Sequence, residues 1–190
     1  MRSTLHRLGS AAAAIGLAAG LGVISTGSAQ ADVGPGWWTQ NGSYQISSDW
    51  GTSANCLDNS SQYGLRMYPC NAPSYNNGYQ KWKAINTDDV TDGAQLQSQA
   101  PGSNGCLDWS PQYGLRTYSC NWSSFINGYQ NWEVWFRTDS SGGQEIVLKN
   151  GLPNSPSICL DNSQYGVRGY ACNGASQDAF YQGWQLQEWN

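Results

Sequence analysis

Short runs of apolar and aromatic residues alternate with stretches rich in Gly, Asn, Ser and Thr along most of the chain. These turn-forming residues recur about every ten positions, so no long amphipathic helix is predicted. The runs are strand-like, and the first strand of each group falls at residues 43–47, 94–99 and 145–150. Short strands with turn signals at this spacing indicate an all-β sandwich or barrel.

One pattern occurs three times. It begins with Cys-Leu-Asp, passes through Tyr-Gly and an Arg to a second cysteine, and closes with Gln-x-Trp. The unit is about 50 residues long, and its copies cover about residues 40–85, 86–135 and 136–190. A fixed period indicates a repeat architecture. Four strands in each unit predict twelve short strands in a barrel with a pseudo-three-fold axis.

The first 31 residues have the features of a secretory signal peptide. Arg2 and Arg7 form a basic start, residues 11–24 are apolar, and residues 29–31 read Ala-Gln-Ala. The apolar run is shorter than the roughly 20 residues of a transmembrane helix. We therefore expect cleavage after Ala31 and one extracellular domain over residues 32–190.

Charge narrows the classes of partner. Cleavage removes Arg2 and Arg7, which leaves 7 basic and 13 acidic residues and a formal net charge of 7 − 13 = −6. Such a chain is a poor candidate for nucleic acid or anionic membranes, which bind clustered Lys and Arg. The only histidine, His6, leaves with the signal peptide. Histidine-based catalysis and histidine zinc sites are thereby excluded, and no metal or cofactor is predicted.

All six cysteines lie in the mature chain. Disulfides are expected for an even number of cysteines in a secreted chain. The pairing that respects the repeats joins the two cysteines of each unit: Cys56–Cys70, Cys106–Cys120 and Cys159–Cys172. With all six paired, no thiolate is left as a nucleophile or metal ligand.

Three copies of Cys-Leu-Asp, a second cysteine and Gln-x-Trp resemble the ricin B-type (QxW)₃ lectins. The repeats are similar to those of actinohivin-like lectins and of xylan-binding modules. The resemblance covers essentially the whole mature chain and implies a β-trefoil fold. It implies a non-catalytic carbohydrate-binding protein with up to three equivalent weak sites that act together on a glycan. We expect this protein to be a monomer. The Trp and Leu of each unit are expected in the core, with the Gln bonded to backbone.

Each repeat offers four candidate carbohydrate-binding residues, an Asp, an Arg, a Tyr and an Asn. They are Asp58, Arg66, Tyr68 and Asn71; Asp108, Arg116, Tyr118 and Asn121; and Asp161, Arg168, Tyr170 and Asn173. Strand alternation places each Asp opposite the buried Leu and toward solvent. The Asp and the Asn could equally be turn residues. The resemblance favours the Asp as the principal sugar ligand, the Tyr as a stacking platform and the Asn as a further ligand.

The arginines depart from the family pattern, and two interpretations stay open. Each Arg could donate its planar fork to a ligand such as an acidic sugar, or pair with the Asp of its own repeat and occupy the ligand's place. The loop tyrosines Tyr63, Tyr113 and Tyr165 could be packing residues or a second stacking surface. Trp109 in the second repeat and Gly169 in the third break the three-fold pattern.

Two other classes of function compete with a lectin. A glycosidase needs a pair of carboxylates, and Asp88, Asp89 and Asp92 form a cluster, but only after the first repeat. Catalysis is therefore not expected. A trefoil interaction protein or protease inhibitor is the other alternative, because one fold serves many functions. Such a protein would concentrate its distinctive residues in one exposed loop, whereas this chain repeats its exposed residues.

Overall fold

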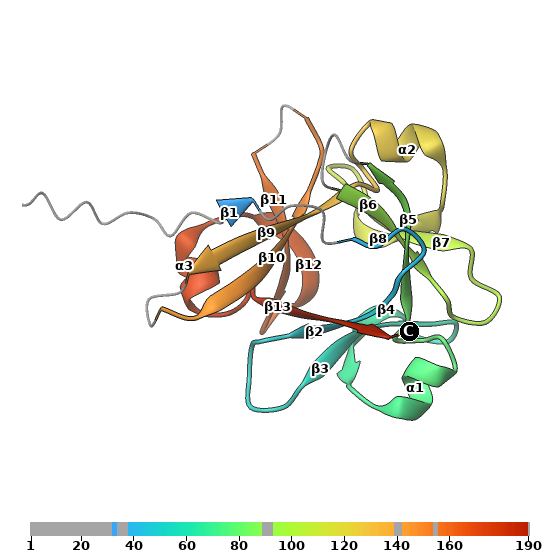
Figure 1. Cartoon of the computed structure of the whole chain (residues 1–190), viewed down its shortest axis with the longest axis horizontal. Coiled ribbons are helices and arrows are strands. Elements are labelled where there is room, and N and C mark those ends of the chain that lie inside the picture. Colours follow the sequence, from blue (N-terminus) through green and yellow to red (C-terminus); the bar gives the residue numbers. More distant parts are fainter. Residues whose placement is uncertain (1–31, 34–37, 89–92, 139–141, 154–155, 190) are drawn as a thin grey trace, which may run out of the picture.

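The computed structural model describes residues 32–33, 38–88, 93–138, 142–153 and 156–189. The expected signal peptide, residues 1–31, lies outside the described residues. Six strands form a closed barrel in the order β9–β10–β13–β2–β5–β6, with β6 pairing back to β9 (Figure 1). The barrel strands are β2 (Ser43–Ser48), β5 (Trp82–Asp88), β6 (Gly93–Ser98), β9 (Trp132–Thr138), β10 (Gln144–Asn150) and β13 (Trp184–Trp189).

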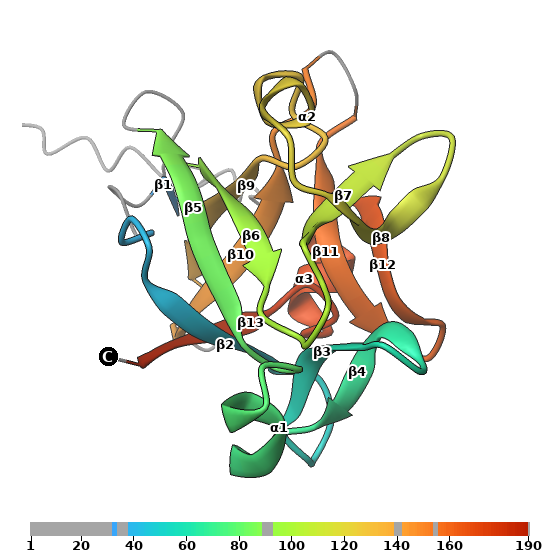
Figure 2. The ribbon, with the colours of Figure 1, turned by 90° about the vertical axis from the view of Figure 1, so that its right-hand side faces the viewer.

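Three antiparallel hairpins lie outside this barrel (Figure 2). They are β3 (Asn55–Ser60) with β4 (Gly64–Pro69), β7 (Gly105–Ser110) with β8 (Gly114–Ser119), and β11 (Ile158–Ser163) with β12 (Gly166–Ala171). Strands β4, β8 and β12 contact one another, so the three hairpins meet. A two-residue strand, β1 (Asp32–Val33), pairs with β9. The all-β prediction is confirmed, and the described residues contain twelve strands besides β1.

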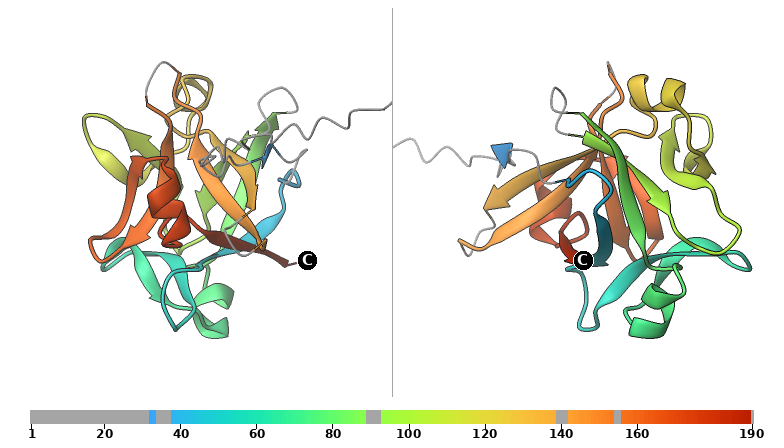
Figure 3. Two further views of the ribbon diagram at one scale, coloured as in Figure 1. Left: turned by 90° about the vertical axis from the view of Figure 1, so that its left-hand side faces the viewer. Right: turned by 45° about the vertical axis from the view of Figure 1, so that its right-hand side comes forward.

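Each hairpin is followed by a five-residue helix that the sequence pattern did not predict. These are α1 (Ala72–Asn76), α2 (Trp122–Ile126) and α3 (Gly174–Asp178). They are spread around the molecule and do not pack together (Figure 3). Five residues are too few to show a helical period of hydrophobic positions, so pattern reading misses such a helix. The described helices include none that is long and apolar enough to cross a membrane.

The Gln-x-Trp residues hold the hairpins to the barrel. Trp82, Trp132 and Trp184 are buried, and the Nε1–H of each donates to the carbonyl of the repeat's Leu at 2.9 Å. These acceptors are Leu57, Leu107 and Leu160, themselves buried. The glutamine side chains are also buried and bond to backbone where each hairpin ends. The core assignments are therefore confirmed.

The three predicted disulfides are present: Cys56–Cys70, Cys106–Cys120 and Cys159–Cys172. Each joins the first strand of a hairpin to the residue just after its second strand. The described part of the chain contains no free cysteine. Three disulfides in a chain of this size indicate an oxidising, extracellular type of compartment.

Candidate functional site

Hairpin register brings the Asp and Arg of each repeat face to face. Asp58 pairs with Arg66, Asp108 with Arg116 and Asp161 with Arg168 as direct cross-strand neighbours. The Arg Nε donates to Asp Oδ1 at 3.1, 3.1 and 2.9 Å respectively. Side chains opposite each other in an antiparallel pair lie close enough to interact. The same ion pair therefore forms three times.

The aspartates are buried, which corrects the expectation that they face solvent. Asp58 is 1%, Asp108 2% and Asp161 0% exposed. Alternation does place each Asp on the strand face opposite its Leu. However, the paired arginine side chain lies on that face and is itself only about one-third exposed, at 32%, 32% and 34%. The Arg covers the carboxylate and meets the solvent in its place.

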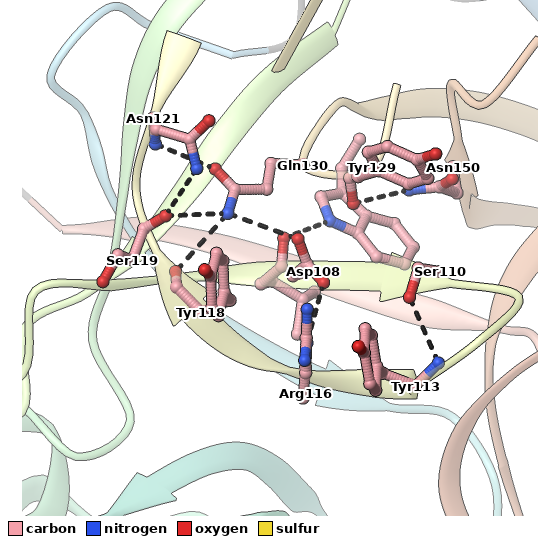
Figure 4. Close-up of polar contacts among 12 residues, drawn as sticks. Asp108, Ser110, Tyr113, Arg116, Tyr118, Ser119, Asn121, Tyr129, Gln130 and Asn150 are labelled. Carbon is pink, nitrogen blue, oxygen red and sulfur yellow. Dashed lines mark hydrogen bonds and ion pairs between the residues drawn. The ribbon is translucent and has the colours of Figure 1, made fainter. Parts of the chain in front are cut away.

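Two tyrosine rings flank each guanidinium group. Arg116 Cζ lies 4.4 Å from the ring centre of Tyr113 and 4.5 Å from that of Tyr118, and Figure 4 shows the arginine between the two rings. Arg66 lies 4.5 Å from both Tyr63 and Tyr68. We call this Tyr–Arg–Tyr arrangement the arginine sandwich. In this arrangement the loop tyrosine contacts the arginine of its own repeat. The sequence alone did not distinguish a packing role from a stacking role for this tyrosine.

The third repeat keeps the sandwich despite its shorter hairpin loop. Arg168 Cζ lies 4.3 Å from the ring centre of Tyr170 and 5.0 Å from that of Tyr165. All six tyrosine rings are exposed, from 41% for Tyr68 to 72% for Tyr165. A cation over an aromatic face is stabilising by about 0.5–1 kcal/mol at exposed sites. Each repeat therefore presents a held arginine bordered by two accessible aromatic rings.

The asparagine of each repeat joins the hairpin to its helix. Asn71, Asn121 and Asn173 are the N-cap residues of α1, α2 and α3. In the first repeat the Asn71 Oδ1 accepts from the Ser74 N–H at 2.8 Å, while Nδ2 donates to the Pro69 carbonyl at 2.8 Å. The other two repeats make the same bonds. Asparagine is among the best N-cap residues, so this role alone explains it.

The buried glutamine of Gln-x-Trp was expected to bond only to backbone, but in the second repeat it also contacts the site. Gln130 Nε2 donates to Asp108 Oδ2 at 3.3 Å, as well as to the Ser119 carbonyl at 3.1 Å (Figure 4). In the third repeat, Asp161 Oδ2 is buried and finds no hydrogen-bond partner among the described residues. The contact between Gln130 and Asp108 is visible only in the folded structure, because the two residues are 22 positions apart in the sequence.

A pocket of about 450 Å³ opens beside the second sandwich. Its lining includes Asp108, Tyr113, Arg116, Tyr118, Ser124 and Tyr129. This volume is within the usual range for small-molecule sites. Tyr129, which directly precedes Gln130 of the Gln-x-Trp motif, also lines this pocket.

The two residues that break the three-fold pattern contact each other. Trp109 is buried, and a side chain at Gly169 would place its Cβ 2.2 Å from Trp109 Cδ1. Trp109 therefore packs against the backbone of the third hairpin. Its neighbour Asp108 faces the site, and Trp109 itself contributes no ring to the pocket lining.

No metal-binding cluster accompanies these sites in the part of the chain that the structure describes. No group of three or more His, Cys, Asp or Glu side chains is close enough there to hold a metal ion. Asp89 and Asp92 lie outside the described residues. Comparison with models of known protein families and with curated proteins found no match.

Proposed function

We propose that this protein is a secreted, non-catalytic carbohydrate-binding protein of the β-trefoil fold, with one sugar site on each hairpin. A closed six-stranded barrel with three outer hairpins supports the trefoil assignment. Three disulfides support secretion. The resemblance to ricin B-type lectins supports a glycan as the ligand.

The observation that carries the proposal is the arginine sandwich, present in all three repeats with exposed rings. Each ion pair joins a buried carboxylate to a partly exposed arginine. The desolvation cost of a buried charge offsets much of the attraction in such a pair, so net stability is a weak reason to build it three times. Exposed tyrosine rings are suited to stack on the apolar face of a sugar. The guanidinium nitrogens beside them are suited to donate to sugar oxygens. The buried Asp then acts as a positioning residue that orients the Arg.

Three sites on one rigid frame suit a polymeric or clustered ligand. We expect a single sugar to bind weakly at any one of these sites. Binding at several sites raises the overall affinity because later contacts are intramolecular. We therefore expect the monomer to bind polysaccharides or multivalent glycans far more tightly than monosaccharides.

A glycan array tests this function, with a triple variant as the decisive comparison. Changing Tyr68, Tyr118 and Tyr170 to Ala removes one ring from each sandwich. We expect binding to the recognised glycans to fall by about tenfold or more, because each stacked ring contributes about 0.5–1.5 kcal/mol. Ile126→Ser, at an exposed position outside the sandwiches, is the matched control and should bind like the native protein. A blank array, or full binding by the triple variant, contradicts the proposal.

One observation favours a second candidate, an interaction protein. Helix α2 exposes Trp122 and Ile126, both 60% exposed, one turn apart. The equivalent residues are Ala72 and Asn76 in α1, and Gly174 and Asp178 in α3. A feature in one repeat alone suits a single protein partner. Partner binding that is lost in Trp122→Ala and kept in the tyrosine triple variant would support this alternative.

A further inference from the structure

We infer that the sugar bound at each arginine sandwich is acidic, a uronate whose carboxylate is held by the Nη nitrogens of Arg66, Arg116 or Arg168. This inference rests on the proposed function, since it names the class of glycan.

The candidate carboxylates are not accessible to the hydroxyl groups of a neutral sugar. Sugar hydroxyl groups bind well to an accessible carboxylate, which accepts their protons in charge-assisted bonds. Here every candidate carboxylate is covered: Asp58, Asp108 and Asp161 are at most 2% exposed, and each already accepts from its own Arg. The charged group that meets the solvent is instead a donor. A ligand that supplies its own acceptor is therefore favoured.

The arginine is positioned to meet a planar anion. Its Nε is used by the aspartate, and this is the only hydrogen bond that each of these guanidinium groups makes to the described residues. The side chain is about one-third exposed, at 32% for Arg66 and Arg116. The Nη pair is a fork that matches the two oxygens of a carboxylate. The flanking rings and the ion pair hold this fork in place, which lowers the entropy cost of binding.

Local charge permits this contact although the chain as a whole is acidic. The lining of the pocket in the second repeat contains one acidic residue, Asp108, and one basic residue, Arg116. The Asp carboxylate lies at the Nε end of the guanidinium, whereas a ligand carboxylate would contact the Nη nitrogens directly. The ligand carboxylate would therefore lie closer to the guanidinium cation than to the aspartate. Its attraction to the cation acts over the shorter distance and exceeds its repulsion by the aspartate.

A pair of ligands with the same backbone tests the inference on the intact protein. Oligogalacturonate carries a carboxylate on every residue, and its fully methyl-esterified form carries none. We expect calorimetry at physiological salt to show the acid binding at least about tenfold more tightly, the difference between a charged and a neutral acceptor. Equal binding of the ester overturns the inference and leaves the proposed function standing. Binding of neutral glycans alone also overturns the inference and leaves the proposed function standing.

Dextran sulfate separates a carboxylate site from a general anion site. A sulfate ester is also anionic and can accept two hydrogen bonds from a guanidinium group. It is much less basic than a carboxylate and therefore a weaker acceptor, so we expect oligogalacturonate to bind more tightly at equal charge. Stronger or equal binding of dextran sulfate overturns the assignment to a uronate. If no acidic, neutral or sulfated glycan binds, the proposed function fails as well.

A triple Arg66→Lys, Arg116→Lys, Arg168→Lys variant tests the fork itself. Lysine keeps the charge and loses the paired donors, so oligogalacturonate affinity should drop by about tenfold. Lys83→Gln removes a cation from the barrel strand β5 and should leave the affinity unchanged. An equal loss in both variants overturns the local site in favour of general charge. Should the triple variant fail to fold, the ester comparison still decides.

Discussion

The second and third hairpins look alike at the surface and differ underneath. Arg116 and Arg168 each lie between two tyrosine rings and pair with a buried aspartate. Behind these groups, Trp109 of the second hairpin packs against Gly169 of the third. The first and third repeats have asparagine where Trp109 stands. The repeated Arg and Tyr side chains therefore reach the solvent, whereas Trp109 and Gly169 lie where two hairpins meet.

This difference separates two demands on the sequence. Packing between hairpins needs only that the two facing side chains fill the space together. Asn59 meets Thr117 of the next hairpin through a 3.4 Å hydrogen bond, while Trp109 meets a glycine. A tryptophan against a glycine and an asparagine against a threonine both fill the space between two hairpins. No such exchange occurs in the sandwiches, which is expected if an external ligand is what they must fit.

The largest predicted effect comes from filling the space that Trp109 occupies. Gly169→Met introduces the residue of the first repeat, Met67, and its Cβ would lie 2.2 Å from Trp109 Cδ1. Either the ring or the strand must move, and overpacking of this kind costs about 1–3 kcal/mol. We expect a loss at the upper end of this range, because Trp109 is buried where it meets Gly169. Urea denaturation with the disulfides intact measures it.

A double-mutant cycle shows whether Trp109 is the cause. Adding Trp109→Asn to Gly169→Met gives this contact the residue types of Asn59 and Met67 in the first repeat, and should recover most of the lost stability. Thr117→Met is the matched control, since that position faces Asn59 instead of a tryptophan. Trp109 is not the cause of the lost stability if Thr117→Met destabilises the protein as much as Gly169→Met, or if the double variant recovers nothing.

A smaller effect should separate the two ion pairs. Arg168→Ala leaves Asp161 without its Nε donor, and its Oδ2 already lacks a hydrogen-bond partner among the described residues. Arg116→Ala leaves Asp108 with the bond from Gln130. Because an unsatisfied buried polar group costs about 1–3 kcal/mol, we expect Arg168→Ala to be more destabilising by about 1 kcal/mol. Parallel urea titrations of the two variants give this difference.

The same pair allows an internal control. Asp161→Asn combined with Arg168→Ala removes both charges, and should be more stable than Arg168→Ala alone because no ionised group is left buried. Equal losses in the second and third repeats would mean that water solvates both aspartates once the arginine is gone. That result would contradict the role assigned to Gln130.

Much of the fold could be predicted because it rests on spacing. Six cysteines in three regular pairs limited the disulfides, and the buried Trp and Leu positions followed from Gln-x-Trp and strand alternation. The short helices could not be predicted in this way. Each begins at an Asn cap, and a single cap leaves no period in the sequence.

The site was predicted less well, since alternation gives the face of a strand but not what covers that face. Asp58 lies on the expected face and is still buried, because Arg66 extends across it. The eight-residue separation within a hairpin places the two opposite each other only when the loop length is known. The hydrogen bond from Gln130 to Asp108 joins residues from separate elements and leaves no local signal.

The smallest predicted effect lies in the loop tyrosines. Tyr113 has its ring centre 4.4 Å from the Arg116 Cζ and is 60% exposed, whereas Tyr165 lies 5.0 Å from Arg168 and is 72% exposed. Cation–π attraction weakens with distance and with solvation. We therefore expect Tyr113→Ala to lower the free energy of unfolding by about 0.5 kcal/mol and Tyr165→Ala by less. Thermal and urea unfolding at low ionic strength would measure both.

The strand tyrosines provide the baseline for that comparison. Tyr118 and Tyr170 lie 4.5 and 4.3 Å from their arginines, so their alanine variants should differ little from each other. Tyr113→Phe keeps the ring and should retain nearly all the stability that Tyr113→Ala loses. If Tyr165→Ala proves as costly as Tyr113→Ala, the shorter loop does not loosen the third sandwich. The three sites would then be equivalent in rigidity, and the uronate affinities of single-site variants should match as well.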